Sequence, residues 1–244
     1  MNLHQPAAGR ADKLAGELAS ERLAIEKFAV GQSVPRSEDP LLLRGKGRYT
    51  DDVSLPDQAY AVIVRSRNPH GVIRAIQADA AEKMPGVLAV YTAADLQSYG
   101  PLKCVVPLKN RDGSPMQKPW RGALAKDKVR YVGDPVACVV AETVPAAKDA
   151  AEAVEVEIDP LPAVISADDA AREGAPLLYD DVPGNVSLDY HYGDAAAVAA
   201  AFAKAAHVTR LRMVNSRVIV CAMEPRAALA AYDGSRFTLY VGSQ

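Results

Sequence analysis

The chain has 244 residues, of which 49% are hydrophobic and 24% charged, and its formal net charge is -2. This is ordinary globular composition, enough for one large domain or two smaller ones. A net charge so close to zero gives no electrostatic reason to expect nucleic acid or an anionic membrane as a partner.

The first 165 residues predict an extension followed by a mixed α/β domain. Residues 1–33 form the extension, with an amphipathic helix at 11–29 that either docks on its own domain or serves as an arm for a partner. Alternating or continuous apolar runs then predict short strands, separated by two or three helices. The strands are expected at 60–65, within 70–77, at 87–91, on either side of the Gly-Asp-Pro turn within 128–143, and around 154–158. Helices are expected within 78–83, after 91 and from about Pro145, and the stretch 98–121 is loop-rich.

The last 79 residues predict a linker and a small second unit. Residues 166–184 are polar, contain Pro and Gly, and read as an interdomain linker. Strands are expected at 185–193 and 207–217, on either side of a helix that Asp194 caps. The chain then closes with a hairpin: one strand at 227–232, a turn on Asp233 and Gly234, and a second strand at 237–241 that leads to Gln244.

Metal-ligating side chains are few and scattered. The three cysteines and four histidines are far apart, without a C-x-x-C pair (Cys104, Cys138, Cys221; His4, His70, His191, His207). A zinc site or an iron–sulfur cluster needs several ligands at short spacing, so neither is expected. Isolated thiols, the absence of a leader segment and the lack of about 20 consecutive apolar residues favour a soluble, cytoplasmic protein.

Two features, one rich in glycine and one in charge, could indicate nucleotide or phosphate binding, but a structural role explains both better. Gly45 and Gly47 begin a G-x-G-x-x-G pattern, yet residue 50 is a threonine, and no strand leads in or helix out. Glycines that allow a tight turn are the better explanation. The basic cluster nearby is expected to form a local salt-bridge network with neighbouring acids rather than to bind phosphate (Arg36, Arg44, Lys46 and Arg48 with Glu38, Asp39, Asp51 and Asp52).

The remaining polar residues do not identify a reaction. His70 lies in a turn, where a lone histidine is usually structural or solvated. The paired acids are expected to be solvated turn formers, because acid/base partners need burial to separate their pKa values (Asp168, Asp169, Asp180 and Asp181). Glu224 and Arg226 flank Pro225 before an apolar strand, which suggests an ion pair at a domain junction.

Several segments, taken in order, resemble a known family. They include "VPRSEDPLLLRGKGRYTDDVSLPDQAYAVIVRS", "MPGVLAVYTAADL", "VRYVGDPVACVVAE", "AAEAVEVEIDPLPAV", "GAPLLYDDVPGNV", "MEPRAALAAYD" and "FTLYVGSQ". From about residue 34 onward the chain resembles the N-terminal part of the molybdopterin-binding large subunit of the xanthine dehydrogenase and aldehyde oxidase family. Among its branches the carbon monoxide dehydrogenase-like large subunits are the most similar.

The resemblance implies an α+β architecture. An α/β hammerhead domain would occupy residues 34–165, and after the linker an incomplete molybdenum-cofactor-binding α+β domain would begin at 185–244. Family members hydroxylate aldehydes or N-heterocycles, or oxidise carbon monoxide, with water as the oxygen source. Their electrons pass from a molybdenum–molybdopterin cofactor to iron–sulfur and FAD subunits.

The resemblance also assigns one cofactor-binding residue. The glutamine that ends the family's version of the closing strand lies near an oxygen ligand of molybdenum, and Gln244 matches it. The family's catalytic glutamate comes much later, so no catalytic residue is expected here. The chain is therefore expected to be a fragment that binds no cofactor and is inactive until the rest of the large subunit, or a second polypeptide, completes it. The alternative is a non-catalytic interaction or assembly protein that retains the hammerhead domain.

Overall fold

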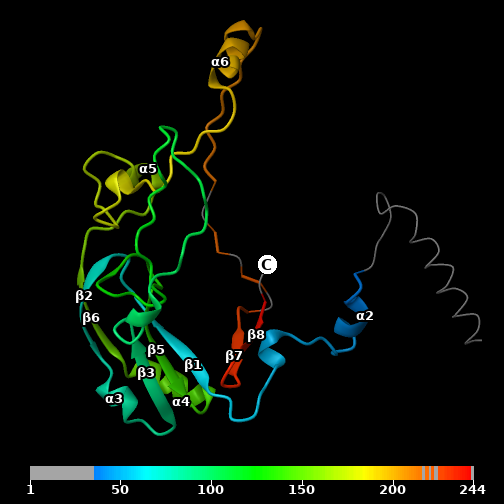
Figure 1. The fold of residues 1–244 in the computed structure, drawn as a ribbon, viewed down its shortest axis with the longest axis vertical. Helices are drawn as coiled ribbons and strands as arrows, with labels where there is room; N and C mark the ends of the chain where they lie inside the picture. Colours follow the sequence, from blue (N-terminus) through cyan, green and yellow to red (C-terminus); the bar gives the residue numbers. More distant parts are fainter. Residues whose placement is uncertain (1–35, 216–217, 220, 223–224, 243–244) are drawn as a thin grey trace, which may run out of the picture. The chain divides into compact units, whose positions relative to one another are not determined.

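The structure is a computed structural model that describes residues 36–215, 218–219, 221–222 and 225–242. It combines short helices with antiparallel strands, which confirms the predicted α+β class. Two compact units are present, one formed by residues 55–216 and the other by residues 1–54 with 217–244 (Figure 1). The helix predicted at 11–29 lies outside the described residues, and the predicted domain boundaries stay a prediction.

The first sheet of the 55–216 unit has β5 at its centre. Its antiparallel order is β1 (Tyr60–Arg65), β5 (Pro135–Ala141) and β3 (Val87–Thr92). Strand β5 has a partner on both sides and is an almost unbroken apolar run, and its residues Val136 and Val139 are fully buried. All three strands were predicted from these apolar runs, and the bounds predicted for β1 and β3 are confirmed to within a residue.

Helix α4 (Val144–Glu152) packs against this sheet. The hydroxyl of Thr143 accepts a hydrogen bond from the Ala146 N–H at 3.3 Å, and Pro145 lies in the first turn, where no N–H is needed. Ala147 and Ala150 are fully buried, because their small side chains let the helix approach the strands closely. Around them lies the first core cluster, whose buried members are Ala81 of α3 (Asp79–Glu82), Ala137, Val139, Ala150 and Val154.

The second sheet supplies the other half of this core. Its order is β4 (Lys128–Val129), β2 (Gly71–Gln77) and β6 (Glu155–Pro160). Val129 of β4 packs with Val136 of β5 and with Ile73 and Ile158. Because side chains alternate along a strand, β5 presents Val136 to this second cluster and Val139 to the first.

The segments between β3 and β4 and after β6 are mostly irregular. The helix expected after residue 91 is wrong: turns and the 3-10 helix η2 (Gln97–Tyr99) follow β3 instead. Thr92, the last residue of β3, donates its N–H to the Asp95 carboxylate at 2.7 Å, which favours a turn over a helix at this point. The linker contains the short helix α5 (Ala167–Ala170) and runs into the 3-10 helix η3 (Pro183–Asn185).

The next segment contains the predicted helix but neither predicted strand. Helix α6 (Ala195–Lys204) begins where Asp194 accepts a hydrogen bond from the Ala197 N–H at 2.9 Å, as expected. The strands predicted at 185–193 and 207–217 are wrong, because their described residues contain no strand. An alternating pattern makes a strand only where a neighbouring strand completes the ladder, and no described strand pairs with either segment.

The other unit contains α2 (Asp39–Leu42), η1 (Thr50–Asp52), β7 (Ala228–Tyr232) and β8 (Phe237–Val241). The tight turn expected near residue 45 is confirmed by the positive φ of Gly45, +65°. Of the salt-bridge network expected here, the described residues form one pair, Arg36–Asp39 at 3.0 Å. The expected pairing of the basic residues at 44–48 with Asp51 or Asp52 is wrong in the described residues, where Asp52 accepts a hydrogen bond from the Tyr49 N–H. No helix in the described part of the chain is long and apolar enough to span a bilayer.

Candidate functional site

The predicted site lies at the end of the β7–β8 hairpin, whose turn is well defined. The Asp233 carboxylate accepts hydrogen bonds from the N–H groups of Ser235 (2.9 Å) and Arg236 (2.8 Å). These bonds, that from the Ser235 N–H first, hold the pKa of Asp233 below its ordinary value. Gly234 takes the positive φ of +94° that the turn requires, and the rings of Tyr232 and Phe237 stack at 4.5 Å between their centroids.

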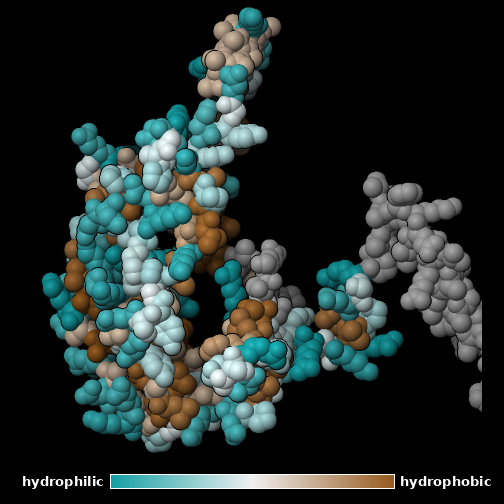
Figure 2. Space-filling model, in the orientation of Figure 1, coloured by the Kyte–Doolittle hydropathy of each residue, from teal (hydrophilic) through white to brown (hydrophobic). Residues whose placement is uncertain are grey.

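One face of the hairpin is apolar and exposed. The register pairs Ala228 with Val241, Ala230 with Leu239 and Tyr232 with Phe237, and paired residues share a face. All six side chains are exposed, including Phe237 at 72% and Leu239 at 60%. Apolar brown surface accordingly shows at the hairpin in Figure 2. A two-stranded hairpin is at best marginally stable alone, so this face is suited to a further covering layer.

Gln244 itself lies outside the described residues, as does Glu224 of the proposed Glu224–Arg226 pair. The described residues nearest to Gln244 are Val241 and Gly242, both exposed. A cofactor site is a concave, largely desolvated cavity. The described part of the hairpin therefore does not enclose a molybdenum cofactor.

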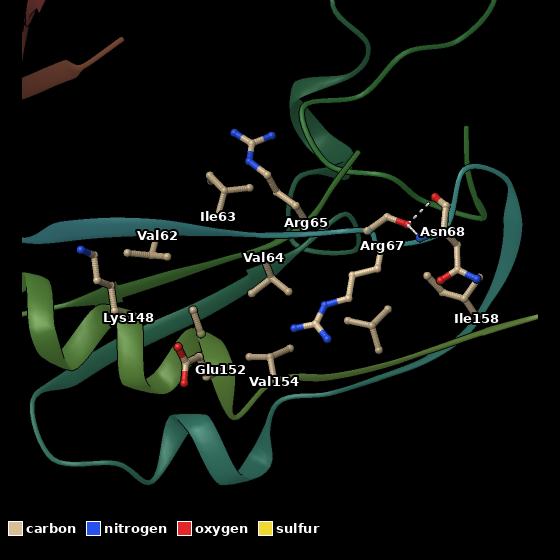
Figure 3. Close-up of a pocket in the computed structure, with 13 residues that line it drawn as sticks. Val62, Ile63, Val64, Arg65, Arg67, Asn68, Lys148, Glu152, Val154 and Ile158 are labelled. Atoms are coloured by element: carbon tan, nitrogen blue, oxygen red, sulfur yellow. Dashed lines mark hydrogen bonds between the residues drawn. The ribbon is translucent and has the colours of Figure 1, made fainter. Parts of the chain in front are cut away.

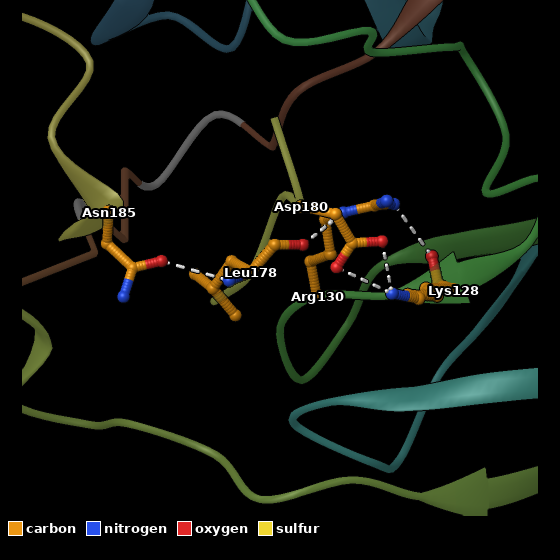
Figure 4. Close-up of polar contacts among 5 residues, drawn as sticks. All are labelled: Lys128, Arg130, Leu178, Asp180 and Asn185. Atoms are coloured by element: carbon orange, nitrogen blue, oxygen red, sulfur yellow. Dashed lines mark hydrogen bonds and ion pairs between the residues drawn. The ribbon is translucent and has the colours of Figure 1, made fainter. Parts of the chain in front are cut away.

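A polar cluster, which sequence analysis missed, fixes the linker to the second sheet (Figure 4). The Arg130 guanidinium donates to the carbonyl oxygens of Leu178 (2.9 Å) and Lys128 (3.0 Å). It also lies over the Tyr179 ring, 4.2 Å from its centroid. Lys128 Nζ contacts the Asp180 carboxylate at 2.8 Å. The hydrogen bond and the charge of Lys128 lower the pKa of Asp180.

Asn185, which follows the linker, belongs to the same cluster and hydrogen-bonds three linker residues. Its side-chain oxygen accepts from the Leu178 N–H at 2.9 Å, and its amide donates to the carbonyls of Ala170 (3.0 Å) and Pro176 (2.9 Å). Its φ is +57°, a conformation that asparagine tolerates better than most residues. The pattern Pro-Gly-Asn at 183–185 was a usable signal for this turn, since each residue favours it.

Beyond η3, the chain is held by the long irregular loop of the hammerhead region. The Gln117 N–H donates to the Ser187 carbonyl at 2.9 Å, and the Arg111 N–H donates to the Asp189 carbonyl at 2.7 Å. Arg111 and Asp189 also form an exposed ion pair at 3.2 Å. Residues 187–189 are thus hydrogen-bonded to a loop and not to a strand, so they form no β-ladder.

The other candidate residues have structural roles. His70 is buried, 3% exposed, and its Nδ1 is 2.9 Å from the Pro162 carbonyl, so Nδ1 carries the donated proton; its Nε2 has no partner among the described residues. His70 therefore has a structural role, which was one of the two predicted alternatives; the other was a solvated side chain. Asp168 pairs with Arg212, and Asp169 with Arg172 at 2.8 Å, both exposed. The described residues contain no cluster of three or more His, Cys, Asp or Glu side chains arranged to hold a metal ion.

Two family models match the chain. Residues 44–162 match the a/b hammerhead domain of aldehyde oxidase and xanthine dehydrogenase, and residues 178–244 match the molybdopterin cofactor-binding domain. The second match begins at Leu178, which the Arg130–Asn185 cluster holds from both sides. The cluster therefore lies where one matched domain gives way to the other.

Curated proteins and solved structures agree with these matches. The chain is 36% identical over 224 residues to the nicotine 6-hydroxylase large subunit of Paenarthrobacter nicotinovorans, covering 90% of this chain and 26% of the relative. It is 37% identical to the carbon monoxide dehydrogenase large chain of Hydrogenophaga pseudoflava, with 85% and 26% covered. The crystal structure of quinoline 2-oxidoreductase from Pseudomonas putida 86 matches at 34% identity and a TM-score of 0.72, with 88% and 27% covered. The chain thus spans about a quarter of the length of these relatives.

Proposed function

The chain belongs to the xanthine dehydrogenase and aldehyde oxidase family of molybdenum hydroxylase large subunits, and on this premise we propose that it supplies the N-terminal portion of such a subunit. The observation that carries the proposal is the order of the two domain matches, hammerhead first and cofactor domain second, on a chain that spans 26% of its relatives. The exposed apolar face of the hairpin supports it, because a completed cofactor domain would cover that face.

The completed enzyme oxidises an aldehyde, an N-heterocycle or carbon monoxide, with water as the oxygen source. The relatives support this range of substrates, since nicotine and quinoline are N-heterocycles and carbon monoxide is the third case. The sequence of the hammerhead region does not indicate which of these substrates the enzyme oxidises. Electrons leave the completed enzyme through iron–sulfur and FAD subunits, in keeping with relatives that are named as large subunits or as one subunit of a complex.

Gln244 is the proposed contact of this chain with the molybdenum cofactor. When bound, that cofactor supplies the two-electron oxidation chemistry of the family. The side-chain amide of Gln244 would help to hold and orient this cofactor by donating a hydrogen bond to it. The rest of the pocket and the working carboxylate come from the remainder of the large subunit. The chain alone accordingly binds no cofactor and has no activity.

The proposal is tested by co-expressing the chain with a second polypeptide that carries the remaining domains of a related large subunit. We expect the two to purify together and to hydroxylate a substrate of the relative, whereas neither does so alone. Gln244→Ala should lower kcat of the complex without releasing the second polypeptide. Gln97→Ala, at an exposed position of η2, is the matched control and should leave kcat unchanged. Equal rates for the two variants would contradict the role of Gln244.

One observation favours the alternative of a non-catalytic assembly protein. Every buried residue of the described chain lies between Ser66 and Val182, so the hammerhead core closes without the residues that follow. A protein that kept only this core would still fold and still present its surface. The co-expression experiment separates the two functions, because an assembly protein would not associate with the remaining domains into an active enzyme.

A further inference from the structure

A cavity that the proposed function does not use lies beside β1. Its volume is about 550 Å³, and it is lined by β1, by the end of α4 and by β6. Figure 3 shows Val64 of β1 pointing toward Val154, so part of the wall is apolar, and polar and charged side chains line the rest. Its volume falls within the range of about 300–1,000 Å³ that is typical of ligand pockets.

Two strand edges border this cavity. Strand β1 is the edge of the first sheet and β6 is the edge of the second, so each leaves one row of backbone N–H and C=O groups without a strand partner. Residues 60–64 of β1 include neither a charge nor a proline, the usual devices that protect an edge, although the pairing becomes irregular between Val64 and Arg65. The edge is therefore open to the addition of a strand.

The polar residues of the cavity carry mostly positive charge. Arg67, from the β1–β2 turn, extends toward the cavity in Figure 3, and Lys148 lies on the α4 side. The described residues offer no ion-pair partner to either, although Glu152 is the one acidic side chain in the lining. Arg65 is turned away and donates to the Gly133 carbonyl at 3.0 Å. An occupant that brings carboxylates would supply the missing partners.

We propose that the edge of β1 and the cavity beside it form a docking site for an extended acidic segment of a partner protein. The segment adds as a strand to β1 through its backbone. Its alternate apolar side chains contact Val62 and Val64, and its carboxylates pair with Arg67 and Lys148. Strand addition of this kind takes its affinity from the backbone and its specificity from alternate side chains.

The test uses the full chain and a capped synthetic peptide, EVTVEVTE, as the probe. Binding is measured by isothermal titration and by backbone amide shifts in NMR spectra. We expect binding that shifts the amides of β1 and α4, and no binding of the lysine counterpart KVTVKVTK. Two further peptides, each N-methylated at one alternate set of amides, should differ, because only one set faces β1 in an added strand.

Variants of the chain test the charges. Arg67→Gln with Lys148→Gln should weaken binding of EVTVEVTE at least about tenfold, because two charge-assisted contacts are lost. The matched control, Lys46→Gln with Lys83→Gln, removes two exposed charges that do not line the cavity and should leave the affinity unchanged. Absence of binding, equal affinity of both N-methylated peptides, or equal effects of the two double variants would overturn the proposal. A dimer of the chain that dissociates on Val62→Lys would assign the edge to a second copy and would overturn it too.

Discussion

In the hammerhead region Val129, Val136 and Val139 are fully buried, whereas Val198 and Val241, which follow Val182 in the sequence, are 53% and 43% exposed. The residue type is the same, so composition does not account for the contrast. The first three valines lie on strands whose sheets are covered by α4 or by each other. The others lie on a helix without a buried residue and on a two-stranded hairpin. Burial therefore follows from closure of the layers, and among the described residues it is found between Ser66 and Val182.

Helices α6 and α4 show the same contrast in burial. The alanine-rich helix α6 has ten residues, a good cap and strong helix propensity, and none of its residues is buried. Helix α4 is shorter, at nine residues, and buries two alanines against the strands. Since isolated helices of this length are marginal in water, α4 owes its stability to packing, and α6 requires a surface that covers Val198 and Phe202.

The largest effect is expected from a substitution in the buried core, and the same substitution in the exposed hairpin is its control. Val139→Ala should lower the free energy of unfolding of the hammerhead region by about 2–3 kcal/mol, because two buried methyl groups are replaced by a cavity. Val241→Ala, the same change at an exposed site, should alter it by no more than about 0.5 kcal/mol. Chemical denaturation followed by tryptophan fluorescence, from Trp120, measures both. Equal losses would show that the two regions share one core.

The next effect concerns the linker between the regions. Asn185→Ala removes three hydrogen bonds and places alanine at a φ of +57°, so the linker should lose about 2 kcal/mol of local stability. Amide hydrogen exchange at Leu178 reports this loss directly. Asn185→Gly is the matched variant, because glycine removes the same bonds but accepts the conformation. If the glycine variant exchanges as slowly as the wild type, the hydrogen bonds do not hold the linker.

A smaller effect is expected at Arg130. Arg130→Lys keeps the charge but loses the planar contact with Tyr179 and one of the two carbonyl bonds, which should cost about 1 kcal/mol of linker stability. Exchange at residues 178–185 should accelerate, while exchange in β5 should not. The control is Arg121→Lys, at an exposed position whose side chain makes no recorded contact in the described residues. Faster exchange in β5 would mean that the linker and the core open together.

The smallest effect is the pH dependence of the Lys128–Asp180 pair. Lys128 lowers the folded-state pKa of Asp180 below the ordinary value of 3.8, so the pair stabilises the linker above that value and loses its effect as the pH falls through the lowered pKa. Lys128→Met should return the pKa of Asp180 toward 3.8 and remove this acid dependence. Carboxyl-carbon NMR titration measures the shift. An unchanged pKa in the variant would show that another group sets it.

Local patterns predicted the elements whose stabilising contacts are near in sequence. The bounds of β1 and β8 and the cap of α6 follow from apolar runs, a four-residue turn and one aspartate, and all three are confirmed. The strands expected at 185–193 and 207–217 are wrong because a strand needs a partner, and the alternating pattern does not say whether one exists. The fold class was predictable for the same reason as β1, because most of its helices and strands are indicated by local sequence patterns.

The polar cluster at the linker was not predictable from patterns of this kind. Arg130 and Leu178 are 48 residues apart, so their hydrogen bond depends on tertiary structure. Asp180 was interpreted as a solvated turn acid, and only the placement of β4 shows that Lys128 reaches it. Gln244 was assigned by resemblance alone, and its role stays a prediction.

The central claim is that this chain supplies one part of a molybdenum cofactor site and not the whole. Molybdenum and pterin content per protein, measured on the purified chain alone and on the chain co-purified with the remaining domains, tests it most directly. We predict stoichiometric molybdenum and pterin in the complex and none that survives gel filtration with the chain alone. Stoichiometric cofactor on the chain alone would contradict the claim.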